Sequence, residues 1–84
     1  MHLYVALLGG PMEEGLMGEG HEIVMVVAPD PVEAKARARA KWHGVGRGHV
    51  DAVQRIETVD GYGVSLEPVA EGDGPDQSEI VSFN

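Results

Sequence analysis

The stretch PVEAKARARAKWH, residues 31–43, decides the fold because it is the one long helix that the sequence predicts. Asp30 precedes Pro31 and lies three residues before Glu33, so an N-cap acceptor, a proline at the first helical position and a capping-box acid coincide. Further along, alanine alternates with lysine or arginine. This period of two is typical of a strand, but these residue types strongly favour a helix. We therefore predict a helix over the whole stretch, with Gly44 as its stop signal.

The helical pattern leaves open which side of the helix packs on the rest of the chain. Two faces carry apolar or small side chains, and the basic residues lie between them. The first face consists of Val32, Ala36, Ala40 and His43, and the second of Ala34, Ala38 and Trp42. Either face would let the helix lie close to a sheet, because most of these side chains are alanines.

Two strand-like segments precede the helix. Residues 2–8 and 22–28 are apolar on both alternating faces, which is typical of strands that are covered on both sides. A chain of 84 residues with one helix cannot cover both faces of such a pair by itself. The sequence therefore predicts a homodimer or higher homo-oligomer, built face to face or edge to edge.

Two further strands are predicted after the helix, over residues 50–59 and 62–66, joined through Asp60-Gly61. We expect a three-residue loop here, because it pairs Ile56 with Val64, whereas a two-residue loop pairs apolar with polar residues. The expected fold is thus α+β in the order ββαββ, a mainly antiparallel sheet with one helix packed on one face.

The chain divides by composition into a single α+β domain, residues 1–68, and an acidic C-terminal tail, residues 69–84. The tail ends in Ile80, Val81 and Phe83, which we expect to dock on a sheet edge. Cysteine is absent, so neither disulfides nor thiolate metal sites are available. No apolar run approaches the roughly 18 residues of a membrane span, and we expect a cytoplasmic protein.

Charge is distributed unevenly along the chain. Residues 35–55 hold all six Lys and Arg residues and one acid, Asp51, a net charge of +5, whereas the remainder holds thirteen acids and no base. One interpretation is internal charge complementarity with a solvated helix face. The alternative is anion or nucleic-acid binding through the basic helix, residues 35–41. We prefer the first, because Trp42 has no aromatic neighbours in this segment and the overall charge of −8 opposes nucleic acid.

Candidate site residues lie where the predicted elements begin or end. They are His21, Glu22, Trp42, His49 and Asp51. A helix that returns along the sheet should bring its end back to the start of the second strand, so we predict that the five cluster. Histidine and carboxylate ligands suit zinc or manganese, and His21, His49 and Asp51 are the candidate metal ligands. The alternative is that these groups only satisfy local hydrogen bonds. No catalytic or phosphate-binding motif is present, no cofactor is predicted, and enzymatic activity stays open.

Five short motifs resemble the family of small bacterial proteins known as domain of unknown function 1543. They are LLGG at residues 7–10, His21-Glu22, the helix end Lys41-Trp42, GHVDA at 48–52 and VDGYGVSL at 59–66. The resemblance covers roughly residues 3–67. It implies that the domain occurs in one or two copies per chain, which is consistent with self-association, and it implies no particular activity.

Overall fold

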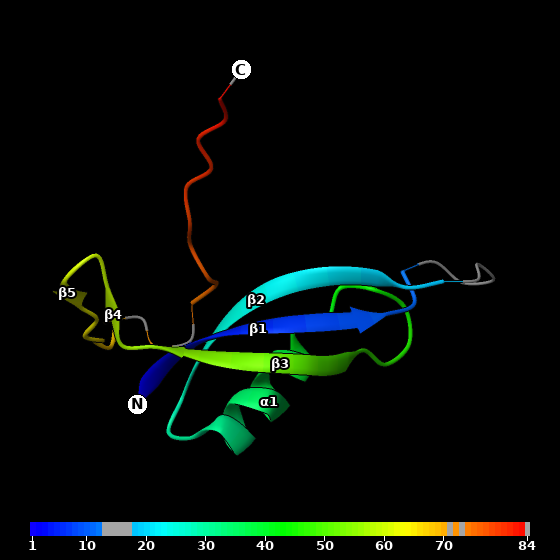
Figure 1. Cartoon of the computed structure of the whole chain (residues 1–84), viewed down its shortest axis with the longest axis horizontal. Coiled ribbons are helices and arrows are strands. Elements are labelled where there is room, and N and C mark those ends of the chain that lie inside the picture. Colours follow the sequence, from blue (N-terminus) through cyan, green and yellow to red (C-terminus); the bar gives the residue numbers. More distant parts are fainter. Residues whose placement is uncertain (13–17, 71, 73, 84) are drawn as a thin grey trace.

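The computed structural model describes residues 1–12, 18–70, 72 and 74–83. In chain order its elements are β1 (His2–Gly10), β2 (Gly20–Ala28), α1 (Pro31–Ala40), β3 (His49–Ile56), β4 (Thr58–Val59) and β5 (Tyr62–Gly63). The first three strands form an antiparallel sheet in the order β2-β1-β3, and the last two form a separate hairpin. Helix α1 lies along one face of this sheet (Figure 1). The α+β class with one helix and an antiparallel sheet is confirmed.

The start of α1 follows the predicted capping pattern. Asp30 has an extended backbone (φ −154°, ψ 168°), and its Oδ1 accepts a hydrogen bond of 2.8 Å from the Glu33 amide. The helix nevertheless ends at Ala40, three residues before the predicted end at His43. The amides of Lys41 and Trp42 donate to carbonyls three residues back, which tightens the last turn and terminates the helix.

The core of the domain lies entirely between α1 and the sheet. The helix buries Ala34 and Ala38, whereas Val32 on the competing face is 81% exposed. The sheet contributes side chains from alternate positions of two strands, namely Tyr4, Ala6, Leu8, Val24, Val26 and Ala28, with Trp42, Val50 and Val53 packed beside them. The alanines of α1 allow the close approach that the sequence predicted.

The opposite face of the sheet has no covering layer in the part of the chain that the structure describes. We call this surface the open face. The prediction that the first two strands are covered on both sides is therefore wrong for the single chain. Among the described residues, α1 is the only helix, and it packs on the other side of the sheet. Ile23 and Met25 are 68% and 61% exposed. From strand alternation and pairing, the open face consists of Leu3, Val5, Leu7, Ile23, Met25, Val27, Ala52, Gln54 and Ile56.

The β4-β5 hairpin corrects the predicted loop length. Thr58 pairs with Gly63 and Val59 with Tyr62, so the loop is the two-residue Asp60-Gly61 rather than three residues. Both loop residues are left-handed, with φ of 53° and 81°, as a type I′ turn requires. The expectation of apolar pairing failed because this hairpin buries no side chain, so turn geometry alone selects the register.

The free edge of β2 is capped by side chains from α1 and from Lys41, the residue just after it. Lys41 Nζ donates to the Met25 carbonyl at 2.7 Å, and Arg37 donates to the carbonyl of Val27. Lys41 Nζ also lies 2.8 Å from Asp76 Oδ2, and this ammonium holds the pKa of the Asp76 carboxyl below its usual value. These contacts occupy backbone acceptors that an added strand would need.

The C-terminal tail is tied to the domain at Asp76 and then leaves the sheet on the side away from α1 (Figure 1). Ile80 and Phe83 are 89% and 93% exposed. Docking of these side chains on a sheet edge, as expected from the sequence, is not found within the chain, because the base of the tail is held where it points outward.

Candidate functional site

A row of three residues crosses one end of the sheet. Gly9 on the central strand pairs with His21 of β2 on one side and His49 of β3 on the other. Directly paired residues share a face, and alternation along β1 places this row at the end of the open face. A Cβ atom at Gly9 would lie 2.9 Å from His49 Nε2 and 3.2 Å from His21 Cδ2. The sum of these distances, about 6.1 Å, is an upper limit on the separation of the two ring atoms.

Two carboxylates approach these rings. Asp51 Oδ1 lies 3.2 Å from His49 Nε2. Glu19 lies between the two rings, with Oε1 3.9 Å from His49 Nε2 and Oε2 3.8 Å from His21 Nε2. We refer to Glu19, His21, His49 and Asp51 as the histidine–carboxylate cluster. Its side chains are between 41% and 57% exposed, so they face solvent with room to turn.

Strand β3 is irregular next to His49. Leu7 pairs with Ala52 and Leu8 with Val50, so Asp51 is the extra residue of a β-bulge. A bulge bends its strand and redirects the side chain of the extra residue. Glu19 was not among the predicted site residues. The available signal was its position two residues before His21, since residues two apart in an extended chain share a face.

Glu22 and Trp42 lie on the other side of the sheet. Glu22 pairs with buried Leu8 on β1, and its oxygens accept from the backbone amide of His43 and contact His43 Nδ1, both at 2.8 Å. Trp42 packs against the core and donates from Nε1 to the Val45 carbonyl at 3.3 Å. The structure therefore brings three of the five predicted residues together and separates the other two from them. Glu22 is separated because consecutive strand residues point to opposite faces, and Trp42 because it packs against the core.

The contact between Glu22 and His43 should make stability depend on pH. The hydrogen bond from His43 lowers the pKa of the Glu22 carboxyl below 4.5, its ordinary value. A carboxyl whose pKa is lowered by folding stabilises the fold above its ordinary pKa, and this contribution is lost as the pH falls through the lowered pKa. Glu22→Gln should therefore lower the melting temperature at pH 7 by roughly 4–8 °C, the shift that about 1 kcal/mol causes in a domain of this size. At about pH 2 the difference should be smaller, because protonation of the Glu22 carboxyl removes this contribution.

Thermal unfolding followed by circular dichroism at both pH values measures this effect. Glu67→Gln, at an exposed glutamate, controls for the general change in net charge. An equal loss from Glu22→Gln at both pH values would contradict the assignment.

Two basic side chains, Arg37 of α1 and Lys41 just after it, are engaged within the chain. Arg37 Nε lies 3.1 Å from Glu33 Oε1 in addition to its contact with β2, and Lys41 bridges β2 and the tail. Arg39 is half-buried. These contacts pair two of the six basic residues of the positive segment with acids of the same chain. Among the described residues, no helix has the length and apolar character needed to cross a membrane.

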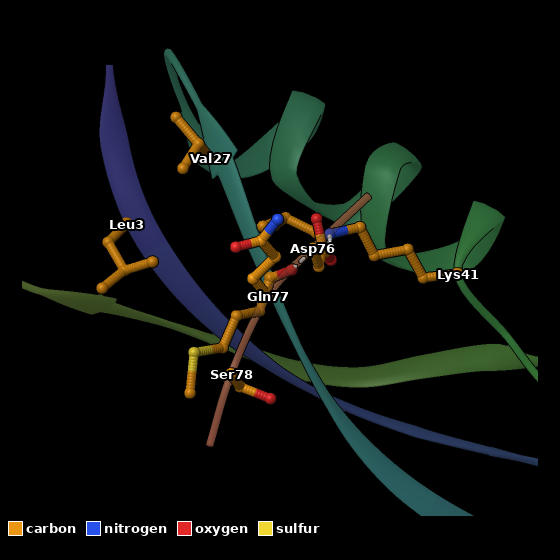
Figure 2. Close-up of a pocket in the computed structure, with 8 residues that line it drawn as sticks. Leu3, Val27, Lys41, Asp76, Gln77 and Ser78 are labelled. Carbon is orange, nitrogen blue, oxygen red and sulfur yellow. Dashed lines mark hydrogen bonds and ion pairs between the residues drawn. The ribbon is translucent and has the colours of Figure 1, made fainter. Parts of the chain in front are cut away.

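A shallow groove lies where the tail passes β2. Figure 2 shows Asp76 turned toward Lys41, with Gln77 and Ser78 following beside the strand. Leu3, Met25 and Val27 of the open face line the same groove. The base of the tail is thus placed next to the exposed apolar side chains of the sheet.

A three-stranded antiparallel sheet with one helix on a face, followed by a short hairpin, defines a small α+β domain. The chain belongs to the family described as Domain of Unknown Function (DUF1543), whose model matches residues 16–66. The matched range includes His21, His49 and Asp51, and it confirms the resemblance seen in the sequence motifs. No curated protein and no solved structure matches the chain significantly.

Proposed function

We propose that this protein is a non-enzymatic homodimeric module in which two copies pack through their open faces. The supporting observation is the row of exposed apolar side chains that alternates along β1 and β2 opposite the helix. Contiguous exposed apolar surface of this kind is typical of interaction sites rather than of solvent-facing sheets. A second copy would supply the layer that the chain itself does not provide.

Charge favours a second copy in this position. The open face, as defined above, includes no charged residue, whereas the whole chain carries a net charge of −8. Two copies therefore repel one another across most other surfaces and can meet here without placing like charges together. The capped edge of β2 argues for face-to-face packing, because Met25 and Val27 already use their carbonyls.

The open faces of two copies are too small for a stable interface unless the tail also contributes. Three strands of up to nine residues span roughly 30 by 14 Å, or roughly 800 Å² of flat area from two copies. Stable interfaces bury about 1,200–2,000 Å². Residues 79–83, fully extended, reach about 16 Å, which exceeds the ~10 Å between packed sheets. Ile80, Val81 and Phe83 of each copy would thus reach the other copy and add apolar contact.

Sedimentation equilibrium tests the dimer. The chain has a mass of 8.9 kDa, so the dimer is expected at twice that mass at micromolar concentrations. Leu7→Glu should raise the dissociation constant at least about 100-fold, equivalent to about 2.7 kcal/mol, because each copy then buries a carboxylate in an apolar contact. Removal of residues 79–84 should weaken the dimer without abolishing it.

The matched control is Val32→Glu, the same kind of change at an apolar side chain that is 81% exposed on α1, away from the open face. It should leave the dissociation constant unchanged. A wild-type protein that stays monomeric at about 100 μM, or equal weakening by both substitutions, would refute the proposal.

A further inference from the structure

We infer that the histidine–carboxylate cluster binds one divalent transition-metal ion of the zinc type at the rim of the open face. This site is separate from the proposed dimer, since its residues lie beyond the apolar rows at the end of the sheet where Gly9 pairs. Imidazole nitrogens and carboxylate oxygens are the ligands that zinc takes in the absence of cysteine.

The sheet holds the two histidines in place for a shared ion. Strands two apart in a sheet are separated by about 9.6 Å, and a side chain on the strand between them would normally keep two facing rings apart. Here the middle position is Gly9, and a Cβ atom there would come within 2.9 Å of His49 Nε2. The missing side chain thus provides the space over which both rings lean. Gly9 is buried beneath the two histidine rings, although the rings themselves are exposed.

The distances between the donor atoms are close to those of ligands around one ion. Two ligands bound to zinc at ~2.0–2.1 Å with a tetrahedral angle are about 3.3 Å apart. His49 Nε2 and Asp51 Oδ1 are 3.2 Å apart, and the Glu19 oxygens are 3.8–3.9 Å from the two histidines. Both histidines present the same nitrogen, Nε2, to the carboxylates. The pair of His49 and Asp51 therefore already has the spacing of two ligands on one ion.

Side-chain rotation is needed to bring the four donors around one ion. In the part of the chain that the structure describes, no three donors already surround one point as a metal would need. Closing each Glu19 contact requires a shift of about half an ångström, from 3.8–3.9 Å to about 3.3 Å. The two histidine rings, whose Cδ2 and Nε2 atoms across Gly9 are at most about 6.1 Å apart, must also turn toward one another. All four side chains are at least 41% exposed, so torsions can supply this movement without displacing the strands. Two carboxylates also balance the charge of a divalent ion when both imidazoles are neutral.

Metal binding is tested on the full chain with zinc and cobalt(II) separately. Native mass spectrometry should show one ion per chain, and cobalt(II) should develop the visible absorption of a histidine-ligated site. His21→Ala and His49→Ala should each weaken zinc binding in calorimetric titration by at least about 100-fold, because each removes a direct ligand. Asp51→Asn, which keeps the size of the side chain, should weaken it about 10-fold.

The matched control is His43→Ala, since His43 is also an exposed histidine but pairs with Glu22 on the other side of the sheet. Its zinc affinity should equal that of the wild type. Circular dichroism of each variant establishes that it is folded. The absence of stoichiometric zinc or cobalt uptake, or an equal loss of affinity in His43→Ala, overturns the site. Either result leaves the dimer proposal intact, because the latter is measured by mass in metal-free buffer.

Discussion

Replacing Leu8 by alanine should remove about 2–5 kcal/mol from the free energy of unfolding, a large share of the stability of the domain. Leu8 has no solvent exposure. Among the described residues, Leu8 and Tyr4 are the largest fully buried side chains. At ~0.05–0.15 kcal/mol per residue, a chain of 84 residues has a stability of only about 4–12 kcal/mol. A cavity at the contact between β1 and α1 therefore removes a large share of the total.

The adjacent residue supplies a matched control for this substitution. Leu7 carries the same side chain but points to the open face and is 39% exposed. In urea unfolding, Leu7→Ala should lower the free energy of unfolding by less than half as much as Leu8→Ala. The measurement is made at a protein concentration below the dissociation constant of the proposed dimer, so that association does not stabilise either variant. Equal costs at the two positions would mean that the assignment of the two sheet faces is incorrect.

Gly44→Ala should destabilise the domain by about 1–3 kcal/mol, the second large effect that we expect. A Cβ atom at this position would lie 2.2 Å from the Pro11 carbonyl oxygen and 2.2 Å from Trp42 Cζ2. The same carbonyl accepts a hydrogen bond of 2.9 Å from the Val45 amide. Relief of the clash must therefore either break this bond or displace Trp42 from the core.

Urea unfolding of Gly44→Ala, with tryptophan fluorescence as the probe, measures both consequences. Because Trp42 is the single tryptophan of the chain, its emission reports directly on the displaced ring. Gly63→Ala is the control, since a Cβ atom at Gly63 meets no atom within 4 Å. A cost for Gly44→Ala that does not exceed that of Gly63→Ala would show that the segments around residues 11 and 44 are not closely packed.

The role of these loop glycines also shows what sequence patterns leave undetermined. Gly44 is predicted from the sequence to end the helix, but the helix ends earlier, at Ala40. The reason is tertiary: Trp42 packs against the core from outside the helix, and Gly44 and Gly48 lie so close that Cβ atoms there would meet its ring at 2.2 and 2.6 Å. Local propensity carries no information about a contact of this kind.

The candidate site was predictable in part. His21 and His49 could be found because both begin strands, and strand starts gather at one end of a sheet. Placing Glu22 with His21 was the error, since neighbouring residues of a strand face opposite ways. The contribution of Glu19 depends on the path of the chain just before β2, which a loop sequence does not specify.

The sequence by itself determined the features that depend on near neighbours in the chain. The Asp30 cap, the proline start of α1, a hairpin through Asp60-Gly61, though not its loop length, and the alternation of apolar residues along β1 and β2 all follow from interactions within a few residues. Only the tertiary structure decided that Gly9 stands between His21 and His49, and that a bulge at Asp51 shifts the pairing of β3 with β1. Register between strands depends on burial summed over whole faces, and a shift of one residue would move all of these side chains to the other side of the sheet.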